Sequence, residues 1–379
     1  MRRHAGLFAF ASAIFVVAFG AFLRLQPASD LTMHLAVARS LESVSDITYP
    51  HFLLQLLIKA WVAVGVPPAA GLALLLGACY GGMAVLFALE AERRGVRLTR
   101  GELWAVTVAV LIASHVFLLT ALRHNFYYGY FVPIVYHNPT QQLCKLFGLW
   151  IWFRYCRDFL WGGTPSWGRS FGTGTLCAIS AIAKPSFLIA FVPMGGLVAL
   201  WDLIRLRWAR VFRFGFGVAM PAAAILLTQA FIFYGPSAGG ELLFAPFAVF
   251  NASQTAYKLP LSLFFPLVML AATAARGVRH EGADAAGRRA AWRAVWAFAA
   301  IALFETLCLG ERSRLMDGNF AWTGQTGVFL LYVESVLALL SARVARPAQV
   351  VAWTAFAVHV LAGAIWFGAV FFPERVNYL

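Results

Sequence analysis

The chain has 379 residues, 61% of them hydrophobic and 12% charged, with a mean hydropathy of +0.75. This composition excludes a soluble globular protein and predicts a polytopic, all-α membrane protein. The formal net charge of +14 could suggest a nucleic-acid-binding protein. In a membrane chain it is better explained by Lys and Arg residues that hold loops on the cytoplasmic side. We therefore expect the lipid bilayer as a partner and no nucleic acid.

Apolar runs long enough to cross about 30 Å of hydrocarbon recur along the whole chain. The first begins with the basic "MRRH" and would also fit a signal peptide, but its length and poor cleavage pattern favour an uncleaved helix. We expect about eleven spans in one transmembrane domain, residues 1–379. The expected spans are 5–23, 68–91, 103–122, 141–157, 171–184, 186–204, 214–235, 260–276, 294–310, 325–342 and 350–372.

Segment 51–66 is apolar but short, and it lies between Pro50 and the pair Pro67-Pro68. We interpret it as a re-entrant or interfacial helix, with a further full span as the alternative. If the N-terminus is inside and this segment does not cross, most of the 30 Lys and Arg residues fall in cytoplasmic loops, as the positive-inside rule requires. A crossing here would invert every later loop. We therefore expect a multi-pass protein of a bacterial-type inner membrane with a cytoplasmic N-terminus.

Five polar segments fall on the opposite, outer side in this topology. Outward-facing loops on a rigid scaffold are where binding and catalytic residues usually lie. We therefore expect one shared site on the non-cytoplasmic (periplasmic) face. The segments are 24–67, 123–142, Lys184-Pro185, 235–260 and 310–326.

In the first outer segment, Asp30 and His34 are four residues apart and would share one face of a helix. They predict either a carboxylate base with a polar neighbour or the solvated face of an interfacial helix. Tyr49 and His51 follow in "TYPHF", which predicts an extended turn because a residue before proline avoids the α region. Substrate contact and packing explain these two residues equally well.

The second outer segment contains Arg123 and "HNPT", in which His137 and Asn138 precede a proline. Asn138 or Thr140 could cap the helix that follows, and hydrogen bonding to a substrate is the alternative. The aromatic residues nearby predict an interfacial belt, with sugar stacking as the alternative. They are Phe126, Tyr127, Tyr128, Tyr130, Phe131 and Tyr136.

The positive-inside rule explains the Lys and Arg residues of the cytoplasmic loops, but it does not explain the cations on the outer side. Lys184, between two apolar runs and followed by Pro185, either snorkels to the headgroups or pairs with an anion. In the fifth segment the arginines oppose the positive-inside bias, which a phosphate clamp would explain because a guanidinium matches phosphate oxygens. An internal salt-bridge network is the alternative. The residues concerned are Glu311, Arg312, Arg314, Asp317 and Asn319.

With these features the chain resembles the GT-C superfamily of integral membrane glycosyltransferases. The matching features are the inside N-terminus, the acidic first outer loop "PASDLTMHL", the segment "TYPHFLLQLLIKAW", and "AISAIAKPSFLIAFVP" with its lysine after a small-residue span. The likeness covers residues 1–205 most strongly, with the catalytic loop at 24–67, and leaves 206–379 as variable C-terminal helices.

The resemblance implies inverting transfer of a sugar from a polyprenyl-phosphate-linked donor to a glycan or glycolipid acceptor on the non-cytoplasmic face. Carried over to this chain, Asp30 would be the general base. Many family members have two adjacent acidic residues in this loop, whereas here Leu31 follows Asp30. We therefore expect no cofactor and do not favour a metal ion. The cations expected to face the donor phosphate are Lys184, Arg123, Arg312 and Arg314.

Other functional classes could use the same outer face. A polymerase or ligase of lipid-linked glycans would need the same cationic loops. A secondary transporter or lipid flippase would need polar groups near mid-membrane, such as Glu305 or Glu334, and an internal repeat that the two halves do not show. A scaffolding membrane protein is the remaining alternative.

Overall fold

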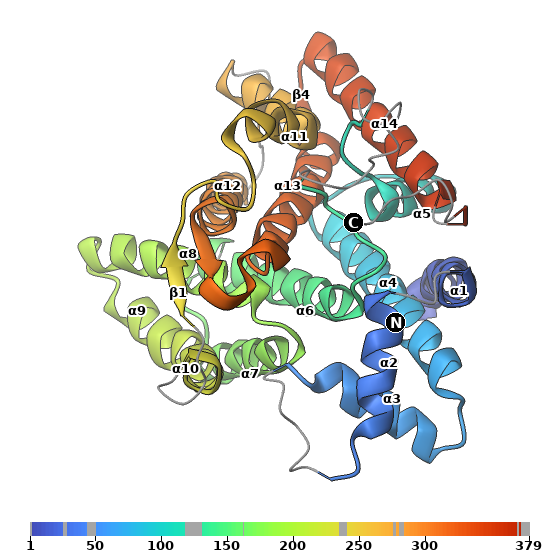
Figure 1. Cartoon of the computed structure of the whole chain (residues 1–379). Helices are drawn as coiled ribbons and strands as arrows, with labels where there is room; N and C mark the ends of the chain where they lie inside the picture. Colours follow the sequence, from blue (N-terminus) through green and yellow to red (C-terminus); the bar gives the residue numbers. More distant parts are fainter. Residues whose placement is uncertain are drawn as a thin grey trace.

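The structure is a computed structural model that describes residues 2–25, 29–43, 51–117, 131–161, 163–234, 241–275, 278–279, 284–369 and 371–372. These residues form a helical bundle with short strands only, which confirms the predicted all-α class (Figure 1). Two antiparallel strand pairs join helix ends. They are β1 (Leu242–Phe244) with β3 (Leu309–Glu311), and β2 (Val278–Arg279) with β4 (Arg343–Val344).

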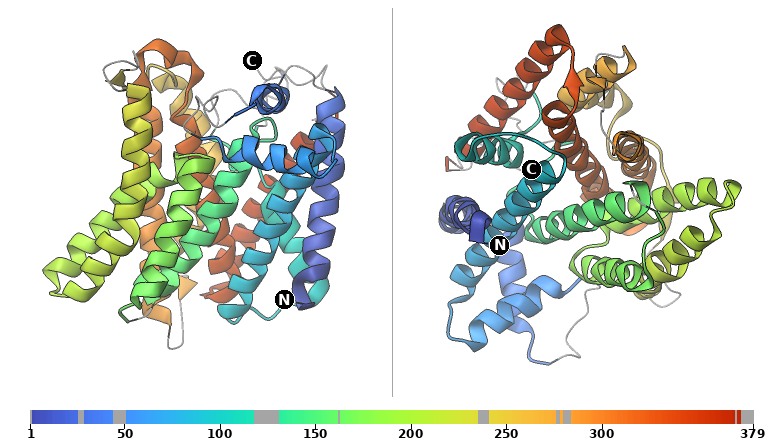
Figure 2. Two further views of the ribbon diagram at one scale, coloured as in Figure 1. Left: turned by 90° about the horizontal axis from the view of Figure 1, so that it is seen from below. Right: turned by 180° about the vertical axis from the view of Figure 1, so that it is seen from behind.

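Most helices run back and forth along one axis, which Figure 2 shows from the side. Helix α13 lies at the centre of the bundle, as shown by its burial: 94% of its most apolar 18-residue segment is buried inside the protein. In chain order the helices along the axis are α1 (Arg2–Leu25), α4 (Pro68–Arg93), α5 (Arg100–Ile112), α6 (Pro139–Tyr155) continued by η3 (Cys156–Trp161), α7 (Trp167–Ala183), α8 (Ser186–Ile204), α9 (Trp208–Phe214) continued through η4 (Gly215–Ala219) into α10 (Met220–Tyr234), α11 (Ala252–Ala274), α12 (Ala285–Cys308), α13 (Ala321–Ser341) and α14 (Arg346–Ala369).

Eight helical segments among the described residues are long and apolar enough to cross a membrane, so the chain is a multi-pass membrane protein. These segments are α1, α4, α8, α9 with α10, α11, α12, α13 and α14. The predicted spans 103–122, 141–157 and 171–184 overlap with α5, α6 and α7. These helices have only 13, 17 and 17 residues, which is short for a membrane crossing. The number of eleven spans therefore stays a prediction.

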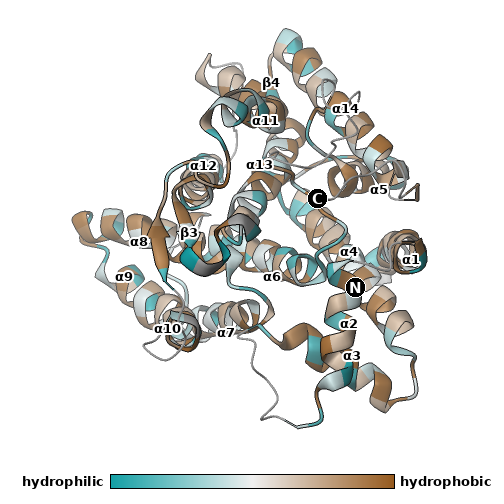
Figure 3. Ribbon diagram, in the orientation of Figure 1, coloured by the Kyte–Doolittle hydropathy of each residue, from teal (hydrophilic) through white to brown (hydrophobic). Residues whose placement is uncertain are grey.

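The circumference of the bundle is hydrophobic. Large apolar side chains such as Leu200, Phe231 and Leu361 are more than half exposed, as expected for residues that face lipid tails. Hydrophilic residues gather instead around α6 and the connection from β3 to α13 (Figure 3). Polar side chains are thus concentrated inside the bundle and at its ends.

Two short helices, α2 (Asp30–Ser40) and α3 (Leu53–Ala63), lie across one end of the bundle (Figure 2). We call this the α2–α3 end; the N-terminus lies at the opposite end. The helix α3 has 11 residues and does not run with the bundle, in agreement with the prediction for 51–66. The next helix starts at Pro68, where the missing N–H of proline leaves no hydrogen bond unmade.

The predicted span 103–122 was wrong for residues 113–117, because the helix ends at Ile112. Residues 118–122 lie outside the described residues. Beyond Ile112 the backbone is extended, and the N–H of Ser114 donates to the carbonyl of His359 on α14 (3.0 Å). The close approach depends on Gly363, where a Cβ atom would overlap the carbonyl of Ile112. Backbone pairing with a neighbouring helix replaces the helical hydrogen bonds that sequence periodicity predicted.

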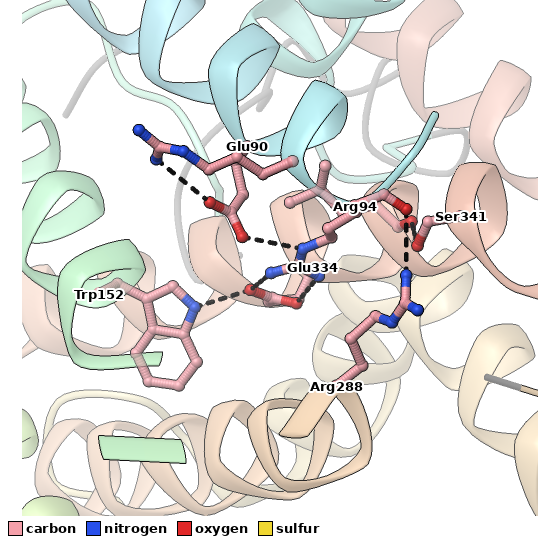
Figure 4. A network of polar contacts seen from close by, with 8 residues as sticks. Glu90, Arg94, Trp152, Arg288, Glu334 and Ser341 are labelled. Carbon is pink, nitrogen blue, oxygen red and sulfur yellow. Dashed lines mark hydrogen bonds and ion pairs between the residues drawn. The ribbon is translucent and has the colours of Figure 1, made fainter. Parts of the chain in front are cut away.

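A buried charge network joins four helices near the end opposite α2 and α3 (Figure 4). Arg94 of α4 donates two hydrogen bonds to Glu334 of α13 (2.7 and 2.8 Å) and one to Glu90 (3.0 Å). The indole N–H of Trp152 on α6 also donates to Glu334 (2.8 Å), and Arg288 of α12 donates to the carbonyl of Arg94 (3.0 Å). Both carboxylates are therefore paired, and the network holds these helices in register.

We predict that Glu334→Gln destabilises the protein strongly, because it leaves the buried guanidinium of Arg94 with one carboxylate partner instead of two. Losing one partner of a buried ion pair costs roughly 3–5 kcal/mol. The measurement is thermal unfolding of the purified protein in detergent. Asp317→Asn is the control, since it breaks an exposed ion pair with Arg314 and should cost less than about 1 kcal/mol. Equal midpoints for the two variants would contradict the structural role of the network.

Candidate functional site

The side-chain amide of Asn138 is the centre of a polar cluster at the α2–α3 end. Its Oδ1 atom accepts hydrogen bonds from the backbone N–H of Gln141 (3.1 Å), the hydroxyl of Thr140 (2.8 Å) and the ammonium of Lys184 (3.1 Å). Three donors on one oxygen determine which way the amide faces. Its Nδ2 atom therefore points away from α6 and donates to the Asp30 carboxylate (3.0 Å).

Asp30 is the first residue of α2 and is partly exposed. The start of α2 is closed by a local turn, in which the hydroxyl of Thr32 donates to the carbonyl of Ser29 (2.8 Å). A carboxylate at a helix N-terminus is stabilised by the partial positive charge of the unpaired N–H groups. The carboxylate of Asp30, the predicted base, is thus stabilised by the dipole of α2 and by the hydrogen bond from the amide of Asn138.

Lys184 lies between α7 and α8 in extended backbone conformation, and Pro185 begins the next helix. Its side chain points into the bundle and is only 7% exposed, so it does not snorkel to the surface. The ammonium also contacts the hydroxyl of Thr140 (3.3 Å) and the face of the Trp322 ring (4.3 Å to the centroid). No ion pair within the described residues includes Lys184. A buried cation without a direct carboxylate partner is suited to binding an anion.

His34 lies one turn after Asp30 and connects the two surface helices. Its Nδ1 atom is 2.9 Å from the amide nitrogen of Gln55 on α3, and both side chains are buried. Burial lowers the pKa of His34 to about 4, and the positive charge of Lys184 adds to this while Asp30 opposes it. The ring is therefore neutral at neutral pH and acts as a hydrogen-bonding group.

His137 precedes Asn138 and packs edge-on against Trp322 (5.8 Å between ring centroids). Burial lowers its pKa to about 4; Asp30 opposes the shift, whereas the positive charges of Lys184 and Lys145 increase it. This histidine therefore lies in the electrostatic field of one carboxylate and two ammonium groups. The structure therefore places His137 near Asp30 and Lys184, whereas its predicted contact with a substrate stays a prediction.

His51 lies just before α3 and belongs to the same surroundings. Burial lowers its pKa to about 3, with further contributions from Lys184, His34 and Arg314. The charge of Arg314 therefore acts on this side of the site. Tyr49 and Arg123, which were predicted as substrate contacts, lie outside the described residues.

The predicted phosphate clamp of the fifth outer segment has its arginines in local ion pairs. Arg312 pairs with Glu241 (2.7 Å), and Arg314 pairs with Asp317 (2.6 Å) in the 3₁₀ helix η5 (Arg312–Asp317). Both arginine side chains are more than half exposed. This geometry fits the alternative of an internal salt-bridge network, and a role in phosphate binding stays a prediction.

Glu311 and Asn319 of the same segment are also occupied locally. The Glu311 carboxylate accepts hydrogen bonds from the hydroxyl of Tyr234 (2.7 Å) and the amide of Asn319 (2.8 Å). Together with the β1–β3 pair, these bonds close the connection between α12 and α13. We therefore assign these two residues to the support of the connection.

The aromatic residues of the second outer segment that the structure describes are buried in the core. Phe131 packs against Phe250 (5.3 Å between centroids), and Tyr136 packs against Trp366 (5.6 Å). These contacts differ from both an interfacial belt and a sugar-stacking platform. The remaining predicted aromatics, Phe126, Tyr127, Tyr128 and Tyr130, lie outside the described residues.

Four residues of the cluster were missed by sequence reasoning: Gln141, Thr326, Trp322 and Gln55. The amide of Gln141 donates to the hydroxyl of Thr326 and to the carbonyl of Trp322 on α13 (2.9 Å each), and the amide nitrogen of Gln55 contacts His34. The signal for Gln141 was available, because "QQLCK" places three polar side chains inside an expected span. In the described ranges no group of three or more His, Cys, Asp or Glu side chains is arranged to hold a metal ion.

The lowered pKa of His34 predicts acid sensitivity. Because its pKa in the folded protein, about 4, is below the ordinary 6.5, protons bind the unfolded chain first as the pH falls. The stability contribution is complete above pH 6.5 and is lost progressively down to pH 4, by up to about 3 kcal/mol. In thermal unfolding followed across this range, His34→Gln should show a flatter pH dependence than the unmodified protein. Parallel curves would contradict the assignment.

Comparison with known proteins gives no relative from which a function could be transferred. No family model, no curated protein and no solved structure matches this chain. The remaining evidence on function is the geometry of Asp30, Asn138 and Lys184 and the position of this cluster in the bundle.

Proposed function

We propose that the chain is an integral membrane glycosyltransferase that moves a sugar from a polyprenyl-phosphate-linked donor to a glycan or glycolipid acceptor. The observation that carries this proposal is the bridge in which Asn138 binds the carboxylate of Asp30 (3.0 Å) and the ammonium of Lys184 (3.1 Å) with opposite ends of one amide. Such a bridge keeps a base and a cation close together but not in contact. A reaction that removes a proton on one side and releases a phosphate on the other needs this arrangement.

In the proposed reaction, Asp30 accepts the proton of an acceptor hydroxyl, whose oxygen attacks the anomeric carbon of the donor. The bond between that carbon and the phosphate oxygen breaks, and its electron pair stays on the phosphate. Lys184 stabilises the negative charge that develops there. Because attack and departure occur on opposite faces of the sugar, the anomeric configuration is inverted. Neutral His34 and His137 are placed to hydrogen-bond sugar hydroxyls.

The position of the cluster supports a donor whose lipid stays in the bilayer. Asp30 begins a helix that lies across the end of the bundle (Figure 2), and Lys184 lies at the junction of two bundle helices. The arginine-rich connections, such as the one that begins at Arg94, occur at the opposite end. With the positive-inside rule this supports a cytoplasmic N-terminus and a site on the periplasmic face of a bacterial-type inner membrane.

A polymerase or ligase of lipid-linked glycans would use the same chemistry and differs only in how many residues it transfers. A secondary transporter or flippase is less well supported. Of the two carboxyls named for a transporter, Glu334 is engaged by Arg94 and Trp152 and lies away from the Asp30 site. Glu305 is buried on α12 and is the one that remains for such a role. An ion-coupled carrier needs a carboxylate that can change its partners.

We predict that Asp30→Asn lowers turnover by about 10²–10⁴-fold, the usual contribution of a general base. The amide oxygen of the new side chain can still accept the hydrogen bond of Asn138, so folding and donor binding should change little. The measurement is release of polyprenyl phosphate from polyprenyl-phosphate hexoses and pentoses in proteoliposomes that contain cell-envelope lipid acceptors, followed by mass spectrometry.

Glu42→Gln is the matched control for Asp30→Asn, because it neutralises an exposed carboxylate of the same surface segment. It should retain full turnover. Near-normal turnover of Asp30→Asn would remove this residue from the mechanism, and no release by the unmodified protein with any donor would reject the proposed function.

Lys184→Met is expected to weaken binding of the donor by roughly 10–100-fold, because it removes a charge-assisted contact to the phosphate. Methionine fills most of the same volume and retains packing on Trp322. Binding is measured with a fluorescent polyprenyl-phosphate sugar and purified protein in detergent. Lys59→Met, on α3 and outside the cluster, is the control and should bind as the unmodified protein does. An unchanged dissociation constant for Lys184→Met would contradict the phosphate role.

A further inference from the structure

A polar stripe continues from the site into the bundle along α6. It starts at Asn138 and passes through Gln141 and Gln142 to Lys145, at the three- and four-residue spacing of one helix face. The last three side chains are 0% exposed. Such a stripe in the interior of a membrane protein is costly unless it has partners or a function.

The stripe lies against Trp322, Thr326 and Phe329 of the central helix α13. Gln141 donates to Thr326 (2.9 Å), and the ammonium of Lys145 lies 5.7 Å from the centroid of the Phe329 ring. One turn before Thr326, Trp322 covers the ammonium of Lys184. The two lysines therefore lie along the same seam between α6 and α13, with Gln141 between them.

Lys145 has no hydrogen-bond partner among the described residues, although it is completely buried. Lysine is almost never fully buried without a partner, because its charge loses hydration. Among the described residues, the two amines of this seam are accompanied by one carboxylate, that of Asp30, and this carboxylate is bound to Asn138. The interior of the site therefore has more cationic groups than carboxylates, and an anion bound there would favour the protonated form of Lys145.

The position of Lys145 allows this charge to act at the phosphate site. It lies about two helical turns, or roughly 10 Å of rise, below Asn138. Long side chains on a helix lean toward its N-terminus, which brings the ammonium back toward Asn138. His137 experiences the charges of both lysines, which places the two within the same electrostatic surroundings.

The excess charge matches the product of the proposed reaction better than its donor. A sugar linked through a phosphodiester to a prenyl chain carries one negative charge, for which Lys184 suffices. When the bond from the anomeric carbon to the phosphate oxygen breaks, the electron pair makes a phosphate monoester, which carries about −1.5 to −2 at neutral pH. A group that interacts more strongly with this second charge than with the donor lowers the barrier rather than only tightening binding.

We propose that Lys145 supplies the second positive charge of the phosphate site and is matched to the dianionic prenyl phosphate that remains when the sugar leaves. The inference rests on the proposed function. Lys145 acts through its charge as a positioning residue, while Lys184 contacts the phosphate. The ligand class that this pair selects is a prenyl phosphate monoester.

The test compares two probes at about pH 7, where a phosphate monoester is mainly a dianion. They are polyprenyl monophosphate and its methyl phosphodiester, titrated into the purified protein in detergent. The unmodified protein should bind the monoester roughly tenfold or more tightly than the diester, the difference expected for one charge-assisted interaction. Lys145→Met should lose this preference while its affinity for the diester changes by less than about threefold. Lys59→Met should behave as the unmodified protein.

Removal of an unpaired buried charge should leave the thermal midpoint of Lys145→Met unchanged or raised. If Lys145→Met does not fold, Lys145→Gln, which keeps a polar group without a charge, takes its place in the comparison. The preference of the unmodified protein for the monoester should disappear as the pH falls below about 6, where the phosphate takes up a proton. Equal affinity for both probes at the higher pH, or an undiminished preference in Lys145→Met, would overturn the role of Lys145 alone. Binding of neither probe by the unmodified protein would overturn the proposed function as well.

Discussion

The amide of Asn138 is the interaction on which the site depends. Its oxygen closes the first turn of α6 and accepts from Thr140 and Lys184, so its nitrogen can only face Asp30. One neutral group thereby lies between a carboxylate and an ammonium and bonds to both. The separation leaves each charge available for a reacting group, which is the property that a general base and an anion-binding cation require.

The buried charged groups are fully paired at one end of the bundle and incompletely paired toward the other. Near the end opposite α2 and α3, Arg94 is matched by Glu90 and Glu334, and the charges bind one another and the helices that carry them. Along the seam from Lys184 to Lys145, the described residues have more amines than carboxylates. Full pairing gives rigidity, whereas an unmatched cation in a low-dielectric interior is stabilised by a bound anion. This contrast is the reason why we propose structural support for one end and ligand binding for the other.

Part of the site followed from sequence patterns. The grouping of Asp30, His34, His137, Asn138 and Lys184 came from placing polar interruptions on one side of a topology set by arginines, and the structure brings these residues together. The arginines of η5 followed the alternative interpretation, because carboxylates close in sequence or across the β1–β3 pair satisfy them. The sequence does not show such competition, since Glu241 pairs with Arg312 only after β1 and β3 have been brought side by side.

Local composition and spacing are enough to predict the all-α class, the membrane environment, the short helix within 51–66 and the division into an arginine-rich end and a polar end. The end of α5 could not be predicted in this way, because Ser114 exchanges helical hydrogen bonding for the backbone of α14. Which buried polar groups have partners also depends on how the helices pack. Whether Lys145 faces a carboxylate or an aromatic ring depends on the side of α13 that packs against α6, and helix periodicity alone carries no information about that choice.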